Sequence, residues 1–149
     1  MKILAADGIS PEGIELLADY EVDVRDKISH EELIEVIGGY DALMVRSASK
    51  VSADVLERAD RLKIIGRAGV GVDNIDVKAA TERGIIVINS LGGNTIAATE
   101  HTMAMMLSLA RNIPAADATM HTGGWNRKAY VGVELRGKTL GVIGMGRIG

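Results

Sequence analysis

The chain has 149 residues, of which 47% are hydrophobic and 25% are charged, with 18 Gly and 2 Pro. This composition is typical of one globular domain, or of one domain and part of another, and it excludes a disordered or collagen-like chain. A net charge of −3 without a basic block argues against binding to nucleic acid or to an anionic membrane. The absence of Cys excludes disulfides, thiolate metal sites and a Cys nucleophile.

The His and aromatic residues do not point to a further site. His30, His101 and His121 do not lie at the spacings of metal-binding motifs, so we expect no metal site and assign none of them to catalysis. Aromatic residues make up 3% of the chain, which argues against a stacking surface for single-stranded nucleic acid. No targeting segment is evident, and no apolar stretch approaches the roughly 18 residues of a membrane-spanning helix. We therefore expect a soluble, cytoplasmic protein.

In the first part of the chain, short β-branched apolar runs alternate with amphipathic stretches. Strands are predicted over residues 2–6, 21–25, 42–46, 63–67 and 85–89. Helices are predicted at 11–18 after Ser10, from the capping box of Ser29 and Glu32, after Ser52, and over 76–83 up to Gly84. This alternation predicts an α/β fold: a flavodoxin-like, doubly wound parallel sheet with helices on both faces, whose usual strand order is 2-1-3-4-5. The nearly continuous apolar run of 85–89 predicts a strand that is covered on both faces.

The pattern changes after Asn94. A long helix is predicted over residues 95–111, a second helix from Pro114 to about His121, a loop over 125–134 and a new strand over 139–144. We therefore predict two domains, one formed by residues 1–97 and one that begins at residue 98 and includes residues 98–149.

Several polar residues directly follow the predicted strands. The third strand leads into Arg46 and Ser47, the fourth into Arg67 and a glycine-rich segment, and the fifth into a loop that ends at Asn94 before a helix. In a parallel sheet these strand ends meet at one edge, where ligands bind. Arg and the backbone N–H groups of a helix start both bind anions, so the pattern predicts a small anionic ligand. The alternative is a set of surface arginines paired with carboxylates, together with ordinary turn glycines.

A second motif, Gly144-Met-Gly146-Arg147-Ile-Gly149, follows the predicted strand at 139–144. In a dinucleotide-binding turn the first glycine permits the tight turn, the second lets the backbone approach a pyrophosphate, and the third lets the helix pack on the strand. Arg147 would then lie near the phosphates. The alternative is an ordinary glycine-rich turn between a strand and a helix.

Taken together, these motifs resemble the D-isomer-specific 2-hydroxyacid dehydrogenase family. The resemblance covers all 149 residues, and it rests on the motifs at 45–47, 66–76, 89–95, 100–102, 125–127 and 144–149. It implies a flavodoxin-like substrate-binding domain over 1–97, and the start of a Rossmann NAD-binding domain, with its first helices and first strand, over 98–149. It also implies hydride transfer between C2 of a 2-hydroxyacid and NAD, in a homo-oligomer. The most similar branch oxidises 3-phosphoglycerate to 3-phosphohydroxypyruvate, the first step of serine biosynthesis.

The resemblance also implies roles for particular residues. The residues expected to bind the substrate are Arg46, Ser47, Arg67 and Asn94. The residues expected to bind the cofactor are Val70, Gly71, Gly144, Gly146, Arg147, Ile148 and Gly149. Arg127 is expected to reach the active site of a neighbouring subunit.

The family's catalytic Arg, Glu and His correspond to positions beyond residue 149, so we expect no catalytic residue in this chain and no turnover by it alone. The acidic residue that selects NAD over NADP also lies beyond this point. Two alternatives remain open. One is another branch of the family, such as a glyoxylate or hydroxypyruvate reductase; the other is a non-catalytic module that binds an anion and dimerises.

Overall fold

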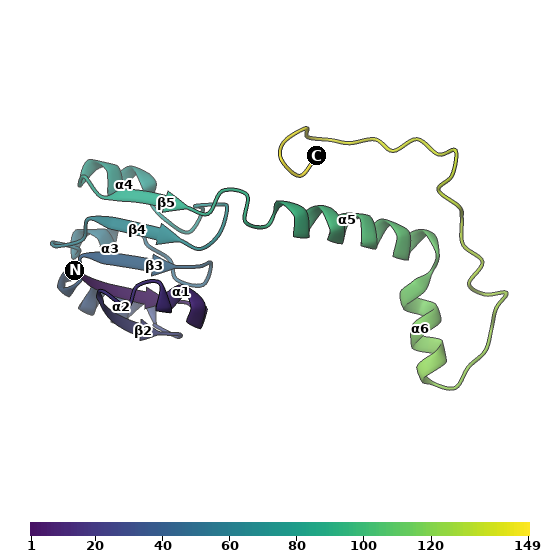
Figure 1. Cartoon of the computed structure of the whole chain (residues 1–149), viewed down its shortest axis with the longest axis horizontal. Helices are drawn as coiled ribbons and strands as arrows, with labels where there is room; N and C mark the ends of the chain where they lie inside the picture. Colours follow the sequence, from purple (N-terminus) through teal and green to yellow (C-terminus); the bar gives the residue numbers. More distant parts are fainter. The chain divides into compact units, whose positions relative to one another are not determined.

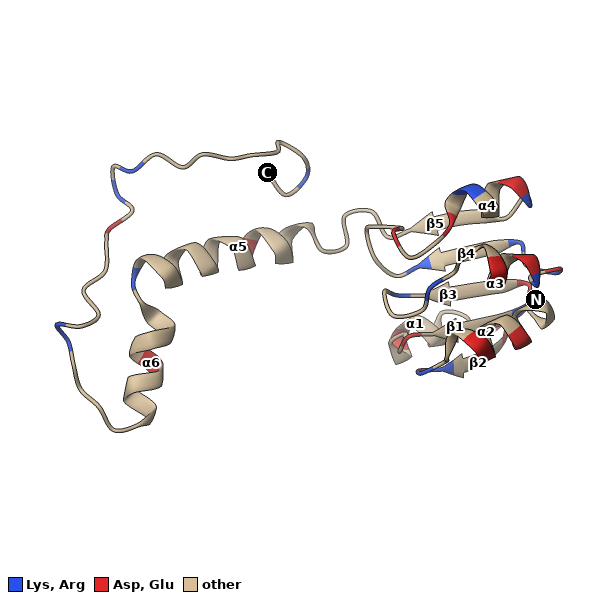
Figure 2. Ribbon diagram, turned by 180° about the vertical axis from the view of Figure 1, so that it is seen from behind, with Lys and Arg blue, Asp and Glu red and all other residues tan.

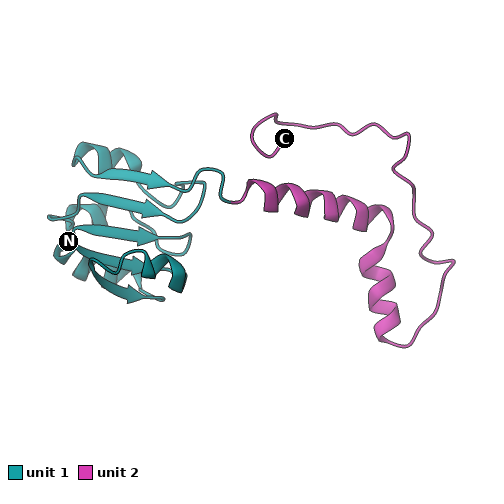
Figure 3. Cartoon of the chain, in the orientation of Figure 1, with its two compact units in different colours: residues 1–93 teal, residues 94–149 magenta.

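The computed structural model describes all 149 residues and divides into two compact units, Met1–Gly93 and Asn94–Gly149 (Figure 3). The domain boundary expected after residue 97 falls within the second unit, near its start. Each unit is described by itself below.

The first unit is built on a five-stranded sheet of order β2-β1-β3-β4-β5 (Figure 1). Its strands are β1 (Lys2–Ala6), β2 (Glu21–Arg25), β3 (Ala42–Val45), β4 (Ile64–Arg67) and β5 (Ile86–Asn89). All four pairings between neighbouring strands are parallel. The predicted doubly wound α/β sheet is therefore confirmed, and its strand order is the usual one for this fold.

Of the four helices between these strands, three are capped by the side chain of the residue before them (Ser10, Ser29 and Asp76), and the helix after Ser52 is not. The four helices are α1 (Pro11–Glu15), α2 (His30–Val36) with the following 3-10 turn η1 (Ile37–Gly39), α3 (Ala53–Glu57) and α4 (Val77–Glu82). Both halves of the capping box are present at α2: the Ser29 hydroxyl accepts from the Glu32 N–H, and the Glu32 carboxylate accepts from the Ser29 N–H. The helix α1 is shorter than predicted, because after Glu15 the N–H groups of Leu17, Ala18 and Tyr20 bond to the third residue before them, which tightens the chain.

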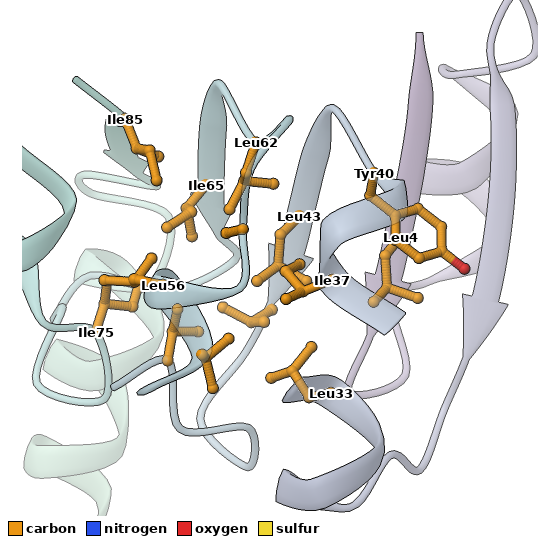
Figure 4. Close-up of a cluster of buried hydrophobic side chains, with 14 of the residues drawn as sticks. Leu4, Leu33, Ile37, Tyr40, Leu43, Leu56, Leu62, Ile65, Ile75 and Ile85 are labelled. Atoms are coloured by element: carbon orange, nitrogen blue, oxygen red, sulfur yellow. The ribbon is translucent and has the colours of Figure 1, made fainter. Parts of the chain in front are cut away.

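The core of this unit lies on the face of the sheet covered by α2, α3 and α4 (Figure 4). Leu4, Leu43 and Ile65 project from neighbouring strands and are fully buried, and Leu33 and Leu56 pack against them from the helices. Removing these side chains from water is the main favourable contribution to folding of the unit.

The prediction that the fifth strand is covered on both faces was wrong. Val87 packs against the core, but the side chains of Ile86 and Ile88 are 60% and 51% exposed on the opposite face. The remaining helix of the unit, α1, has five residues and buries none of its side chains. The apolar composition of β5 therefore did not show whether another element packs on each of its two faces.

The second unit contains α5 (Thr95–Ala110) and α6 (Ile113–His121), joined through Asn112 in the left-handed conformation at φ 54°. Residues 125–134 form a loop, as predicted. The strand predicted over 139–144 does not form, because a strand requires a neighbour to accept its backbone hydrogen bonds and this unit contains no other strand. No helix in either unit is long and apolar enough to cross a membrane.

Candidate functional site

The ends of β3 and β4 bring two arginines to one edge of the sheet. Val45, the last residue of β3, pairs with Arg67, the last residue of β4, and Arg46 follows Val45 directly. Basic residues at the carboxyl ends of these strands appear in blue in Figure 2. The crevice outside the carboxyl ends of parallel strands is where open α/β sheets bind ligands.

Arg46 and Ser47 are both exposed on the loop that follows β3. Neither side chain forms an ion pair or a hydrogen bond within the chain, whereas the backbone of Arg46 does. Its C=O accepts hydrogen bonds from Arg67 Nε at 3.2 Å and from Asn74 Nδ2 at 2.9 Å. The loop is therefore anchored through its backbone while both polar side chains remain available to a ligand.

Arg67 is held more tightly than Arg46. Its side chain is only 10% exposed, and its Nη1 forms an ion pair with Asp73 Oδ1 at 3.1 Å. Because its Nε also bonds the Arg46 carbonyl, the two arginines are in direct contact at the sheet edge. The structure thus brings Arg46, Ser47 and Arg67 together, and places positive charge where an anion could be bound.

Val70 and Gly71 lie on the loop that carries Asp73. A Cβ atom at Gly71 would lie 2.7 Å from both Arg67 Nη1 and Asp73 Oδ1, so only glycine leaves room for this ion pair as it stands. Val70 is 41% exposed, and its carbonyl accepts from the Asn89 amide. The loop therefore links the ends of β4 and β5.

The other predicted site residues belong to the second unit. Asn94 occupies the N-cap position of α5 without a capping hydrogen bond from its side chain. Gly144 has φ +98°, a conformation that favours glycine, and a Cβ at Gly149 would collide with the Gly144 carbonyl. A Cβ at Gly146 would have no atom within 4 Å. Arg147 and Ile148 are exposed on the same turn. That these residues form one binding site with Arg46 and Arg67 stays a prediction.

A concavity of about 590 Å³ beside α2 and α3 was not predicted from the sequence. Among its lining residues, Asp54 accepts a hydrogen bond from the Ser52 hydroxyl at 2.6 Å and lies 2.8 Å from His30 Nε2. The hydrogen bond from Ser52, followed by that from His30, lowers the pKa of Asp54 to about 2. Because these groups satisfy one another, they indicate a link between the two helices rather than open ligand-binding positions.

Comparison with known proteins extends these observations to the whole chain. A family model described as "D-isomer specific 2-hydroxyacid dehydrogenase, catalytic domain" matches residues 3–140. The D-3-phosphoglycerate dehydrogenase of Archaeoglobus fulgidus is 55% identical over 151 residues, which cover 100% of this chain and 29% of that protein. The chain thus spans less than a third of the length of this relative.

Solved structures agree with this similarity. A protein of Thermus thermophilus is 32% identical with a TM-score of 0.91, over 99% of this chain and 50% of that one. The D-lactate dehydrogenase of Aquifex aeolicus, solved in complex with NAD and lactic acid, is 27% identical with a TM-score of 0.80, over 99% of this chain and 45% of that one. The chain covers about half of each of these structures.

Proposed function

Because the chain belongs to the D-isomer-specific 2-hydroxyacid dehydrogenase family, we propose that the protein oxidises 3-phospho-D-glycerate to 3-phosphohydroxypyruvate with NAD. This reaction would open serine biosynthesis, in a cytoplasmic homo-oligomer. One observation carries the proposal: at one edge of the sheet, Arg46 and Ser47 are exposed with side chains that have no partner in the chain, and they lie beside Arg67, which is held in place by hydrogen bonds.

Each of these residues has a role in the proposed binding step. The Arg46 guanidinium can donate two parallel hydrogen bonds to a phosphate or a carboxylate, and the Ser47 hydroxyl adds a neutral donor. Arg67 contributes positive charge from a position fixed by Asp73 and by the Arg46 carbonyl. In the second unit, Asn94 would add an amide donor.

The cofactor is proposed to bind through glycines and backbone groups. Val70 and Gly71 would face its nicotinamide end, and the 144–149 turn would hold its pyrophosphate. The residues of that turn expected to do so are Gly144, Gly146, Arg147, Ile148 and Gly149. When bound, NAD supplies the acceptor for the hydride that leaves C2. The contribution of this chain is to provide open backbone at Gly146 and a positive charge at Arg147.

We further propose that these 149 residues bind the substrate without turning it over. The reaction needs a base for the hydroxyl proton and a positive group near the developing charge on the C2 oxygen. Among the histidines, His30 lies 2.8 Å from Asp54, and His101 and His121 are exposed on helices of the second unit. Measurable NADH oxidation by the purified 149-residue chain with 3-phosphohydroxypyruvate would contradict this part of the proposal.

Calorimetric titration with 3-phosphoglycerate tests the binding step. Loss of a charged hydrogen bond costs about 1.5–3 kcal/mol, so Arg46→Ala should weaken binding by roughly 10-fold to 150-fold. Arg58→Ala is the matched control, because Arg58 follows α3 at the opposite edge of the sheet and its side chain has no partner in the chain. Glycerate, which lacks the phosphate, should bind more weakly than 3-phosphoglycerate. Equal affinities of the wild type and Arg46→Ala would refute the assignment, and equal affinities for the two acids would favour another branch of the family.

A further inference from the structure

The loop that carries Arg46 and Ser47 is fastened from two sides by residues outside the proposed contacts. We propose that Asp7 and Asn74 are positioning residues, which fix the backbone of this loop so that Arg46 and Ser47 converge on the anionic group of the substrate. The inference rests on the proposed function and adds two residues to its binding site.

The Asp7 carboxylate accepts hydrogen bonds from backbone N–H groups of the loop. Its Oδ2 accepts from the backbone N–H of Arg46 and of Ser49, each at 2.9 Å, and its Oδ1 accepts from the Ser49 hydroxyl at 2.6 Å. Asp7 directly follows β1 and has φ +65°, a left-handed conformation that is uncommon for a residue with a side chain. Both carboxylate oxygens are thus engaged by one loop, and the backbone adopts an unusual conformation at this point.

The Asn74 side chain donates hydrogen bonds to backbone carbonyl groups of the same loop. Its Nδ2 donates to the carbonyl of Arg46 at 2.9 Å and to the carbonyl of Ser49 at 2.6 Å. Its own Oδ1 is buried without a hydrogen-bond partner. An unpaired buried oxygen is unfavourable, so the two bonds to the loop are what hold the amide in this orientation.

Together the two side chains engage both backbone polar groups of Arg46 and of Ser49. The residues between them, Ser47 and Ala48, remain exposed. A loop fixed in this way loses little conformational freedom when a ligand binds, and this raises affinity without adding a contact.

The charge of Asp7 makes the proposal easy to test. A carboxylate this close to an anion site opposes anion binding, so its removal by itself should strengthen binding. A positioning role predicts the opposite result wherever the hydrogen bonds are lost with the charge. Asp7→Gly loses both and adopts φ +65° without strain. Asp7→Asn loses the charge but keeps an acceptor oxygen for the two N–H groups, and its amide can donate to the Ser49 hydroxyl.

Titration of the 149-residue chain with 3-phosphoglycerate separates the two explanations. We expect Asp7→Gly and Asn74→Ala each to weaken binding by about tenfold, and Asp7→Asn to bind at least as tightly as the wild type, because it loses only the opposing charge. In an Arg46→Ala background, Asp7→Gly should weaken binding little further, because Asp7 acts through the loop that carries Arg46. Thermal unfolding of each variant ensures that binding is compared between folded proteins.

The outcomes are distinguishable. Equal affinities of Asp7→Gly and Asp7→Asn, or fully additive effects of Asp7→Gly and Arg46→Ala, would overturn this inference while leaving the proposed function intact. If Asp7→Gly does not fold, Asn74→Ala and its combination with Arg46→Ala provide the same comparison. A wild-type chain that does not bind 3-phosphoglycerate would instead overturn the proposed function.

Discussion

The two adjacent glycines of η1, Gly38 and Gly39, allow a sharp test of how the first unit packs. A Cβ added at Gly38 would lie 2.9 Å from the backbone carbonyl oxygen of Arg58, whereas a Cβ at Gly39 would have no atom within 4 Å. Neither glycine has a positive φ, so the backbone conformation does not by itself disfavour alanine at either position. The pair Gly38→Ala and Gly39→Ala therefore isolates a single close contact.

The expected loss of stability in Gly38→Ala follows from that contact. Ordinary van der Waals contact begins at 3.4 Å, so at Gly38 one of the two backbone segments must retreat by about 0.5 Å (3.4 − 2.9). Arg58 follows α3, whose Val55 and Leu56 are fully buried, and this limits its movement. Overpacking of this kind costs about 1–3 kcal/mol. Either alanine also restricts the unfolded chain, which stabilises the fold by about 0.4–1 kcal/mol.

Because that unfolded-state contribution is common to both variants, the difference in stability between them reports only the close contact at Gly38. We expect Gly38→Ala to be less stable than Gly39→Ala by about 1–3 kcal/mol, and Gly39→Ala to equal or exceed the wild type. Urea unfolding followed by circular dichroism at 25 °C measures both differences. Equal free energies of unfolding for the two variants would refute the close approach of η1 to the end of α3.

Three further predictions have defined outcomes. The ionised form of Asp54 stabilises the fold fully above its ordinary pKa of 3.8, and this contribution is lost as the pH falls through about 2, so Asp54→Asn should flatten the acid side of a plot of melting temperature against pH. Asp73→Asn removes a carboxylate beside Arg67 and should tighten binding of 3-phosphoglycerate by up to about fivefold, because two like charges about 4 Å apart repel by about 1 kcal/mol in water; weaker binding would contradict this. Met105 and Leu109 on α5 are 61% and 80% exposed, so light scattering should show self-association, and a monomer of 15.8 kDa at high concentration would count against it.

Local patterns in the sequence were sufficient to predict most elements of the first unit. The capping box at Ser29 and Glu32 depends on residues three apart, and the structure contains both of its hydrogen bonds. The strand order is the usual one for this fold, but alternation of strands and helices does not by itself fix the order. By contrast, the exposure of Ile86 and the missing strand over 139–144 depend on what packs beside a segment, and β-branched composition carries no information about that neighbour.

In the candidate site, too, some contacts could be predicted from the sequence and others could not. The meeting of Arg46 and Arg67 could be predicted, because each is placed by the strand that it ends or follows. The contacts of Asp7 and Asn74 could not, because Asp7 is 39 residues from Arg46 in the sequence and Asn74 is 28 residues from it. Only the folded sheet edge brings these loops together. Asp7 does follow a predicted strand, and that position was the one signal in the sequence that could have suggested it.

We propose that an anionic acid binds at the ends of β3 and β4. The most direct test is to titrate the ¹⁵N-labelled chain with 3-phosphoglycerate and to map the chemical-shift changes of its backbone amides and arginine side chains. We predict the largest changes at Arg46, Ser47 and Arg67, and none in an equal titration with sodium chloride. Changes centred on His30 and Lys50, which line the 590 Å³ concavity, or no changes at all, would contradict binding of the acid at the ends of β3 and β4.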